Sequence, residues 1–341
     1  MASPYVIGQW VRGSRFYGRR AALELLLEPA VGVLWFAGLR RIGKTSLLRE
    51  AERLLNGQPR QSALYWDLQG AADADELNAS LADALYDAEP ALSALGVAVD
   101  QLLAADVVTT VERLLAAAAI GDFRLVVLWD EADELLPLVA AHPRLGLELG
   151  SRLTSAPLCT LVVCSSVRLV PQLDQQQELA FLARSTLRYL GPLSAEASRR
   201  LVRQDQLPLA ARPALDSSQV STVATRCGGH PYLMQLVAKR CLETGDCQQA
   251  VTEIGGERAV EYLFGIDFEL LEPAEQRLLV AAAGGAIDRQ ALANHGQRLV
   301  ALGLVRPAGG RQVTVPNRLL GDWLARRGAA LAAGAKQSRT S

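Results

Sequence analysis

The sequence predicts an α/β fold: a parallel sheet covered by helices, followed by a helical unit and a C-terminal winged helix. In the first half of the chain, continuous apolar runs alternate with helical patterns, which is typical of parallel strands buried on both faces. After Pro192 this strand pattern stops and helical patterns dominate. Near the C-terminus, Gly309 and Gly310 separate two short extended segments and so indicate a hairpin after helices.

The elements of the first half follow one another in a regular order. A helix is expected over 21–28, a strand over 31–37 and a helix over 44–55. Later strands are expected over 63–66, 125–129, 158–164 and, more weakly, 186–190, with helices over 75–88 and 98–120 between them. Trp35, Trp66 and Trp129 lie on these strands, and we expect them in the core because large aromatic side chains on buried strands pack inside.

The chain is expected to divide into four parts: a sheet domain with a lead segment over 1–194, a helical unit over 195–262, a winged-helix domain over 263–327 and a disordered tail over 328–341. Within the helical unit, Gly228 and Gly229 break the pattern and Pro231 begins a new helix. In the third part, helices are expected over 272–283, 288–294 and 295–303, before the hairpin over 306–315.

Length and composition exclude several classes of protein. The 341 residues suit two or three domains, and half of them are hydrophobic, which is enough for a large core. The 35 basic and 36 acidic residues balance, so overall charge points neither to nucleic acid nor to an acidic tail. No membrane-length apolar run and no signal peptide are present, so we expect a cytoplasmic protein. The five cysteines form no CxxC pair, so we expect reduced, buried thiols.

The loop after the first strand carries the clearest chemical signal. It reads GxxxxGK[ST] from Gly38 to Thr45, between an apolar strand and an amphipathic helix. Glycines let backbone N–H groups surround phosphates, Lys44 adds a charge for the β- and γ-phosphates, and Thr45 offers a hydroxyl to Mg²⁺. The sequence therefore predicts a P-loop NTPase core that binds ATP and Mg²⁺. The residues expected to contact the nucleotide are Gly38, Arg41, Ile42, Gly43, Lys44, Thr45 and Ser46.

An acidic pair follows the strand 125–129. Asp130, at the end of that strand, is expected to hold Mg²⁺ together with Thr45, and Glu131 is expected to act as general base toward the attacking water. Lys44 and Glu131 are thus the central catalytic candidates. Asp133 and Glu134 are interpreted as the solvated start of a helix.

The strand over 158–164 ends in Ser165, Ser166 and Arg168. Ligands of open α/β sheets bind at the carboxyl ends of the strands, so Ser165 or Ser166 is a candidate to orient the water and Arg168 a candidate to sense phosphate. Two serines at a strand end are also an ordinary turn sequence, and this alternative stays open. Arg40 and Arg41 have the same two interpretations, as contacts to phosphate or a neighbouring subunit, or as solvated side chains.

Together these motifs resemble the prokaryotic archaeal-type ATPases of the STAND branch of the AAA+-related P-loop NTPases. The resemblance covers about residues 14–325 and rests on Phe16-Tyr17-Gly18-Arg19, the loop with its two arginines, Asp130-Glu131, Arg184 before the last strand, and Gly229-His230-Pro231. It implies that Tyr17, Gly18 and Arg19 lie near adenine, that Pro231 packs on the base or ribose from a helical lid, and that Arg184 or Arg168 senses the γ-phosphate or acts as an arginine finger.

Proteins of this branch act as nucleotide-driven switches, so the resemblance implies core–lid closure coupled to an unidentified protein partner. An arginine finger is commonly supplied by a neighbour, which makes an ATP-dependent homo-oligomer a further expectation. A chain that binds ATP without hydrolysing it is a third hypothesis. His230 is a candidate either for the nucleotide or for helix capping.

The alternative function is a DNA-binding initiator or transposition-helper ATPase. It rests on residues 289–341, where basic residues far outnumber the single acid Asp322, and on a winged helix whose helix near 289–303 would face DNA. Against it, that helix carries few side chains suited to reading bases, and winged helices also serve as packing modules. The basic residues are Arg289, Arg298, Arg306, Arg311, Arg318, Arg326, Arg327, Lys336 and Arg339.

Overall fold

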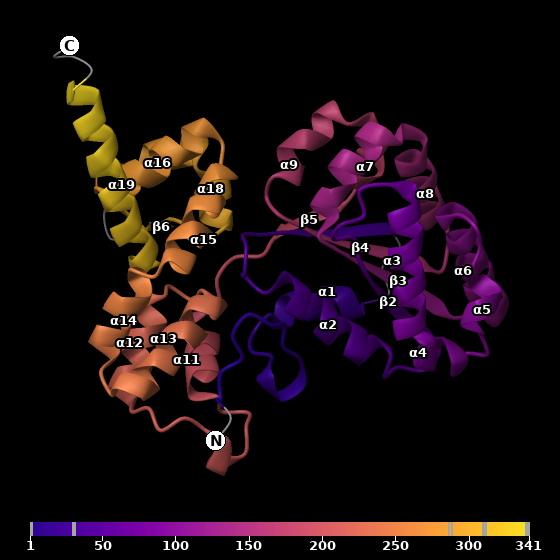
Figure 1. Ribbon diagram of the computed structural model, residues 1–341, viewed down its shortest axis with the longest axis horizontal. Coiled ribbons are helices and arrows are strands. Elements are labelled where there is room, and N and C mark those ends of the chain that lie inside the picture. The colour runs from indigo at the N-terminus through magenta and orange to yellow at the C-terminus, as the bar shows by residue number, and fades with distance from the viewer. Residues whose placement is uncertain (1–2, 29–31, 286, 288, 309–311, 338–341) are drawn as a thin grey trace.

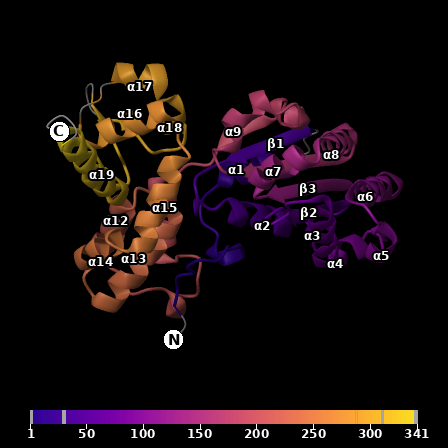
Figure 2. The ribbon, with the colours of Figure 1, turned by 45° about the horizontal axis from the view of Figure 1, so that its top comes forward.

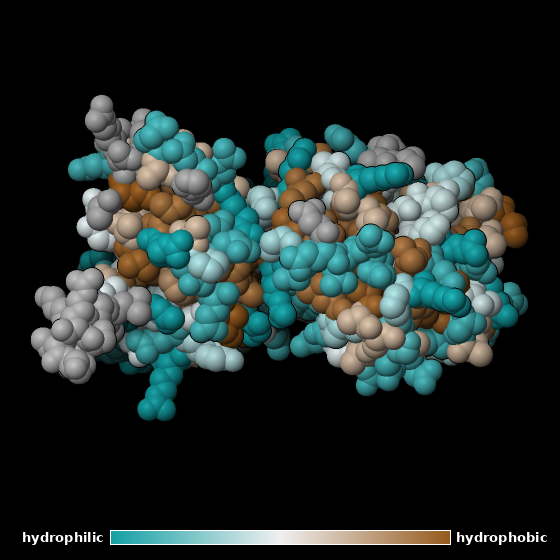
Figure 3. Space-filling view, turned by 90° about the horizontal axis from the view of Figure 1, so that it is seen from above, coloured by the Kyte–Doolittle hydropathy of each residue, from teal (hydrophilic) through white to brown (hydrophobic). Residues whose placement is uncertain are grey.

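The computed structural model describes residues 3–28, 32–285, 287, 289–308 and 312–337, and it has a sheet-containing half and a helical half (Figure 1). Seen from above, the two halves are joined at a narrower waist (Figure 3). The lead segment bridges them: the Tyr5 hydroxyl donates to Val202 O and the Val6 N–H to Gln235 in the helical half, whereas the Val11 N–H donates to Ser46 in the sheet half.

The sheet has five parallel strands in the order β2-β3-β4-β1-β5. Their bounds are β1 Gly32–Ala37, β2 Gln61–Asp67, β3 Arg124–Asp130, β4 Cys159–Ser165 and β5 Thr186–Tyr189. Ala37 at the end of β1 is in register with Ser165 and Tyr189, and Asp67 with Asp130, so the strands end together at one edge. The predicted strands and their parallel pairing are confirmed.

Helices cover both faces of this sheet (Figure 2). On one face, α1 (Arg20–Leu27) and α2 (Lys44–Leu55) bury leucines against Phe36, Val126 and Val162. On the other, α3 (Ala74–Asp87), α6 (Val107–Gly121) and α8 (Pro143–Ser155) pack against the alternate strand residues. Trp35, Trp66 and Trp129 lie on this second face at 1 %, 0 % and 1 % exposure, as predicted.

Short helices fill the connections of the sheet half. They are η1 Gly13–Arg15, α4 Glu89–Ser93, α5 Val99–Leu102, η2 Ala132–Glu134, α7 Leu135–Ala141, α9 Leu169–Gln172, η3 Leu173–Gln175, η4 Gln177–Leu179 and α10 Ala180–Ala183. The single helix expected over 98–120 is wrong, because α5 ends at Leu102 and α6 begins at Val107. Asp106 causes this second start: its carboxylate accepts the Thr109 N–H and so caps α6.

The helical half contains α11 Ala195–Arg203, η5 Leu209–Ala211, α12 Ser217–Arg226, α13 Pro231–Thr244, α14 Cys247–Gly255, α15 Arg258–Glu269, α16 Pro273–Ala283, α17 Arg289–His295, α18 Gln297–Ala301 and α19 Arg318–Gln337. The strands β6 (Arg306–Pro307) and β7 (Val313–Thr314) pair antiparallel, as the hairpin prediction requires, and its Gly-Gly turn lies outside the described residues. One buried cluster continues from Ala197 to Leu324, and residue 262, the expected unit boundary, lies inside α15.

Helix α19 continues as far as Gln337, into the range from residue 328 that was expected to be a disordered tail, because this stretch is rich in alanine, the strongest helix former. The expectation of reduced thiols fails at Cys241 and Cys247, which form a disulfide. The α13–α14 turn brings their Cα atoms to 4.6 Å, within bonding reach. Cys159, Cys164 and Cys227 are free and buried, as expected.

Among the described residues, no helix is both long and apolar enough to cross a bilayer.

Candidate functional site

The loop between β1 and α2 is shaped by close backbone contacts. The Gly38 N–H donates to Ser165 O of the neighbouring strand at 3.1 Å, and a Cβ added at Gly38 would lie 3.0 Å from Leu190 O. Gly43 precedes α2 with a φ of 102°, which favours glycine. These two positions therefore need glycine for geometric reasons, and they place the loop N–H groups at the N-terminus of α2, where anions bind.

Lys44 lies inside this loop. Its side chain is 7 % exposed, and Nζ donates to Gly38 O at 3.3 Å and to Leu39 O at 3.2 Å. The ammonium group is thus held by the carbonyls of its own loop. Thr45, half-buried, follows at the start of α2.

The acidic pair at the end of β3 is held asymmetrically. Asp130 is 1 % exposed, and its carboxylate accepts the Tyr65 hydroxyl at 2.9 Å and the Glu131 N–H at 3.1 Å. Glu131 adopts a left-handed backbone with a φ of 50°, and burial raises its pKa while the charge of Lys44 opposes the rise. Asp130 is therefore fixed in orientation, whereas Glu131 is a more basic carboxylate than an exposed one.

At the end of β4, Ser165 does not suit the role of orienting water. Its hydroxyl is fully buried, accepts the Trp35 indole N–H at 2.8 Å and donates to Ser166 O at 2.8 Å. Ser166 lines the cavity described below, and its N–H and hydroxyl bond to Asp133 at 2.6 and 2.7 Å. The interpretation of Asp133 as solvated is therefore wrong: it fixes the turn after β4. The alternation of side chains along β4 turns Ser165 into the core.

These groups surround a cavity of about 1000 Å³ that lies between the two halves, a size that suits a nucleotide. The sheet half contributes the loop from Arg40 to Ser46 together with Asp130 and Glu131. The helical half contributes Pro231, Tyr232 and Gln235 at the start of α13. The structure thus brings together the loop, the acidic pair and Pro231, which the sequence placed far apart.

The lead segment closes another wall of the cavity. Tyr17 lines it and accepts the Gln206 N–H at 3.2 Å. Gly18 has a φ of 73°, and a Cβ there would lie 2.9 Å from Ala197 Cβ, so this close approach requires glycine. Arg19 also lines the cavity and donates to Gly191 O at 2.6 Å and Ile42 O at 2.8 Å, and burial lowers its pKa to about 10. Arg19 therefore joins the phosphate loop to the segment that enters the helical half.

The two candidate sensor arginines lie elsewhere. Arg168 and Arg184 are exposed, and neither is among the residues that line the cavity. Arg184 precedes β5, at the amino end of that strand, whereas the phosphate loop lies at the carboxyl ends. A role for Arg184 at the nucleotide of its own chain is not supported by this position.

Sequence reasoning missed a stack of side chains at the cavity. The Arg49 guanidinium lies over the Tyr65 ring, 3.4 Å from its centroid, and 5.3 Å from the centroid of Trp10. All three side chains line the cavity. Arg49 is four residues after Thr45 and so on the same helix face, a signal that was available. Tyr65 and Trp10 carried no comparable signal, because their placement depends on the β2–β3 pairing and on the path of the lead segment.

Two contacts tie the loop to the helical half. The Arg40 N–H donates to Asp267 on α15 at 3.0 Å, and Arg41 lies over the Tyr232 ring at 5.7 Å. Arg41 also donates to Gly8 O at 3.1 Å. His230 is the N-cap of α13, where its ring accepts the Leu233 N–H, and burial lowers its pKa to about 4. The helix-capping alternative for His230 is therefore present in the structure.

Comparison with solved structures identifies proteins of similar fold. No protein-family model and no curated protein matches the chain. It is similar to a solved Walker-type ATPase of Pyrococcus abyssi, with a TM-score of 0.66 and 16 % identity over 94 % of this chain and 99 % of that one. It is also similar to the ORC2 protein of Aeropyrum pernix, solved as ADPNP–ADP complexes, with a TM-score of 0.54 and 14 % identity over 96 % and 97 % of the two chains. The chain has a P-loop ATPase fold. At these identities the likeness extends to the fold alone.

Proposed function

We propose that this protein binds ATP with Mg²⁺ in the large cavity, hydrolyses it, and acts as a nucleotide-driven switch of the STAND type. One observation carries the proposal: Lys44, Thr45, Asp130 and Glu131 line a single cavity whose opposite wall, at Pro231, belongs to the helical half. A bound nucleotide would contact both halves, so binding and release would change how they sit together.

The side chains divide the chemistry among them. Lys44 would leave the loop carbonyls and pair with the β- and γ-phosphates. Glu131, with its raised pKa, would accept a proton from the attacking water. Tyr17 and Pro231 would pack on the adenine and ribose, and Arg19 would keep the loop joined to the lid.

The residues fit a magnesium ion. The Asp130 carboxylate and the Thr45 hydroxyl both line the cavity. In the part of the chain that the structure describes, no cluster of three or more His, Cys, Asp or Glu could hold a metal by protein ligands alone. Two protein oxygens, with phosphates and waters completing the shell, are what Mg²⁺ commonly uses at nucleotide sites. When bound, the ion would neutralise charge on the phosphates.

In this proposal, residues 195–262 form the lid and residues 263–327 the winged helix. Closure of the lid on ATP would signal to an unidentified protein partner. The exposed Arg184, remote from its own cavity, would then act as a finger toward the nucleotide of a neighbouring copy in an ATP-dependent homo-oligomer.

Titration of a fluorescent ATP analogue tests the site. Lys44→Ala should weaken binding by on the order of 100-fold, because the loop would lose its charge at the phosphates. The matched control is Lys239→Ala, at an exposed lysine on α13 that pairs only loosely with Glu243, at 3.9 Å. If both variants bind like the wild type, the nucleotide site is wrong. Phosphate release then distinguishes a hydrolysing switch from a chain that only binds ATP.

A DNA-binding initiator is the second candidate, favoured by the exposed Arg306 and Arg318. Arg298 supports it less, because its guanidinium forms a buried ion pair with Glu275. A salt titration of duplex binding tests it: Arg306→Ser with Arg318→Ser should reduce both affinity and its salt dependence. Absence of binding at low salt would eliminate this function.

A further inference from the structure

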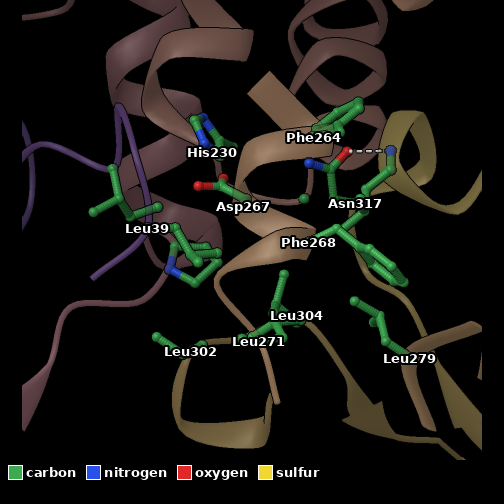
Figure 4. A pocket seen from close by; sticks show the side chains of 15 residues that line it. Leu39, His230, Phe264, Asp267, Phe268, Leu271, Leu279, Leu302, Leu304 and Asn317 are labelled. Carbon is green, nitrogen blue, oxygen red and sulfur yellow. Dashed lines mark hydrogen bonds between the residues drawn. The ribbon is translucent and has the colours of Figure 1, made fainter. Parts of the chain in front are cut away.

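A second cavity, lined mainly by apolar side chains, lies between the phosphate loop and the C-terminal helices (Figure 4). Its walls come from the loop, α15 and the segment after α18: Leu39, Ile42, Phe264, Phe268, Leu302 and Leu304. Two ionisable side chains, His230 and Asp267, face one another within it (Figure 4). Neither is used by the chemistry proposed above.

Asp267 is a buried carboxylate in a cavity whose other walls are mainly apolar. It is 8 % exposed, and its hydrogen-bond donor among the described residues is the Arg40 N–H, at 3.0 Å. Burial raises its pKa to about 7, while the bond from Arg40 and the charges of Lys44 and Arg40 act in the opposite direction. The other titratable group facing it, His230, has its pKa lowered by burial and is neutral at pH 7. The ionised form of Asp267 therefore depends on one backbone donor and on the charges of Lys44 and Arg40.

Phosphate binding would alter that balance. Among the described residues, the Lys44 ammonium donates to two neutral loop carbonyls, so its positive charge is available to stabilise Asp267. Once Lys44 pairs with phosphate, its charge is compensated and a second anion lies near the loop. In a site screened from water, such charges act strongly on a buried carboxylate.

We propose that Asp267 is a positioning residue for the phosphate loop, which holds the Arg40 N–H to α15 while the loop is empty and loosens that hold when phosphate binds. The inference rests on the proposed nucleotide binding. It goes beyond that function by naming the contact, Asp267 with the Arg40 N–H, through which α15 senses the nucleotide.

Helix α15 leads from this contact to the C-terminus. Phe264, three residues before Asp267, and Phe268, the residue directly after it, pack on Trp323 of α19 with ring centroids 6.1 and 5.8 Å away. Arg327 of α19 lies 4.8 Å over the Phe268 ring. A shift of α15 would therefore reach α19 through packed aromatic rings.

Hydrogen exchange on the full chain without nucleotide tests the contact itself. Asp267→Leu should raise exchange of the loop peptide 38–43, whereas Asp267→Asn, whose carbonyl still accepts the Arg40 N–H, should not. The matched control is Glu269→Gln, at an exposed carboxylate on the same helix. Exchange of β3 checks that each variant is folded. Unchanged loop exchange in Asp267→Leu would overturn the positioning role, whether or not ATP binds.

ATP with Mg²⁺ tests the response. In the wild type, ATP should raise exchange of α15, and in Asp267→Asn it should not, because a neutral acceptor is indifferent to phosphate. Asp267→Asn should also bind ATP on the order of tenfold more tightly than the wild type at pH 8, and the difference should shrink at pH 6. If the wild type and Asp267→Asn show the same α15 response, or the same ATP affinity at both pH values, the proposed loosening of the Asp267–Arg40 contact by phosphate, here called the release step, is wrong. A wild type that binds no ATP overturns the proposed function and the release step together.

Discussion

Asp130 and Asp267 are two buried carboxylates beside one phosphate loop, and they are held in different ways. Asp130, 1 % exposed, accepts two hydrogen bonds from its own half of the molecule. Asp267, 8 % exposed, accepts one bond, and its donor belongs to the opposite half. A carboxylate whose hydrogen-bond donors lie in its own half is held rigidly and suits a metal ligand of fixed position. A carboxylate whose donor lies in the opposite half keeps its bond only in one arrangement of the two halves, so it suits a contact that changes between states.

The largest expected effect lies on the sheet side, at the residue next to Asp130. Glu131→Gln removes the proposed base while keeping the size of the side chain, so ATP hydrolysis should fall by at least about 100-fold. ATP affinity should stay within about threefold, because Gln still fits the cavity wall. Glu134→Gln, in the short helix η2 that follows Glu131, is the control. Phosphate release and ATP titration measure the two quantities, and unchanged hydrolysis would remove Glu131 from its role.

Tyr65→Phe probes how rigidly Asp130 is held. The variant deletes the hydroxyl that donates to Asp130 and leaves the ring under Arg49. The Mg²⁺ concentration needed for half-maximal ATP binding should rise by about fivefold to tenfold, because partners of a metal ligand set its orientation.

Binding of ATP in EDTA should not change in Tyr65→Phe. Tyr86→Phe, at an exposed tyrosine bonded to Asp100, provides the comparison. Equal Mg²⁺ dependence in all three proteins would show that Asp130 needs no help from Tyr65.

The smallest expected effect is on stability, at Asp267. In the folded protein the pKa of Asp267 is about 7, above its ordinary 3.8. Between about pH 4 and pH 7 the folded state therefore keeps the Asp267 proton, whereas the unfolded chain releases it. Its stabilising contribution is therefore complete below about pH 4 and is lost as the pH rises through 7. Asp267→Asn should raise the free energy of unfolding by about 1 kcal/mol at pH 8, with no gain near pH 4.

Urea unfolding at pH 5, 6.5 and 8 measures the stability difference between Asp267→Asn and the wild type. His230, whose pKa is lowered to about 4, costs stability below its ordinary 6.5, but this cost is common to both proteins and cancels in the difference. A pH-independent difference would mean that Asp267 does not carry the raised pKa.

Much of the sheet half could be predicted, because its signals are local. Apolar runs such as 125–129 marked strands, and the spacing of Gly38, Gly43 and Lys44 marked the loop between strand and helix. Strand ends of a parallel sheet meet at one edge, so Asp130 could be placed beside the loop from sequence. Asp133 was misread and Ser165 was placed less well than Ser166, because which side chain of a strand end turns inward depends on packing.

The helical half was predicted less completely. The start of α13 at Pro231 was read from a proline, yet nothing local distinguished Asp267 from the other acids of α15. The disulfide was missed because cysteines six residues apart become neighbours only when α13 and α14 fold back on each other. The end of α19 was missed because its alanines and glycines also suit a disordered tail.

By itself, the sequence determined the parallel sheet, the phosphate loop and the acidic pair, since each depends on residue types at fixed spacing along one segment. Only the tertiary structure decided that Tyr65 holds Asp130, that Arg168 and Arg184 lie outside the cavity, and that Asp267 reaches the loop. These are contacts between residues far apart in the chain. They depend on which segments pack together and on the direction of each side chain, and no local pattern encodes either.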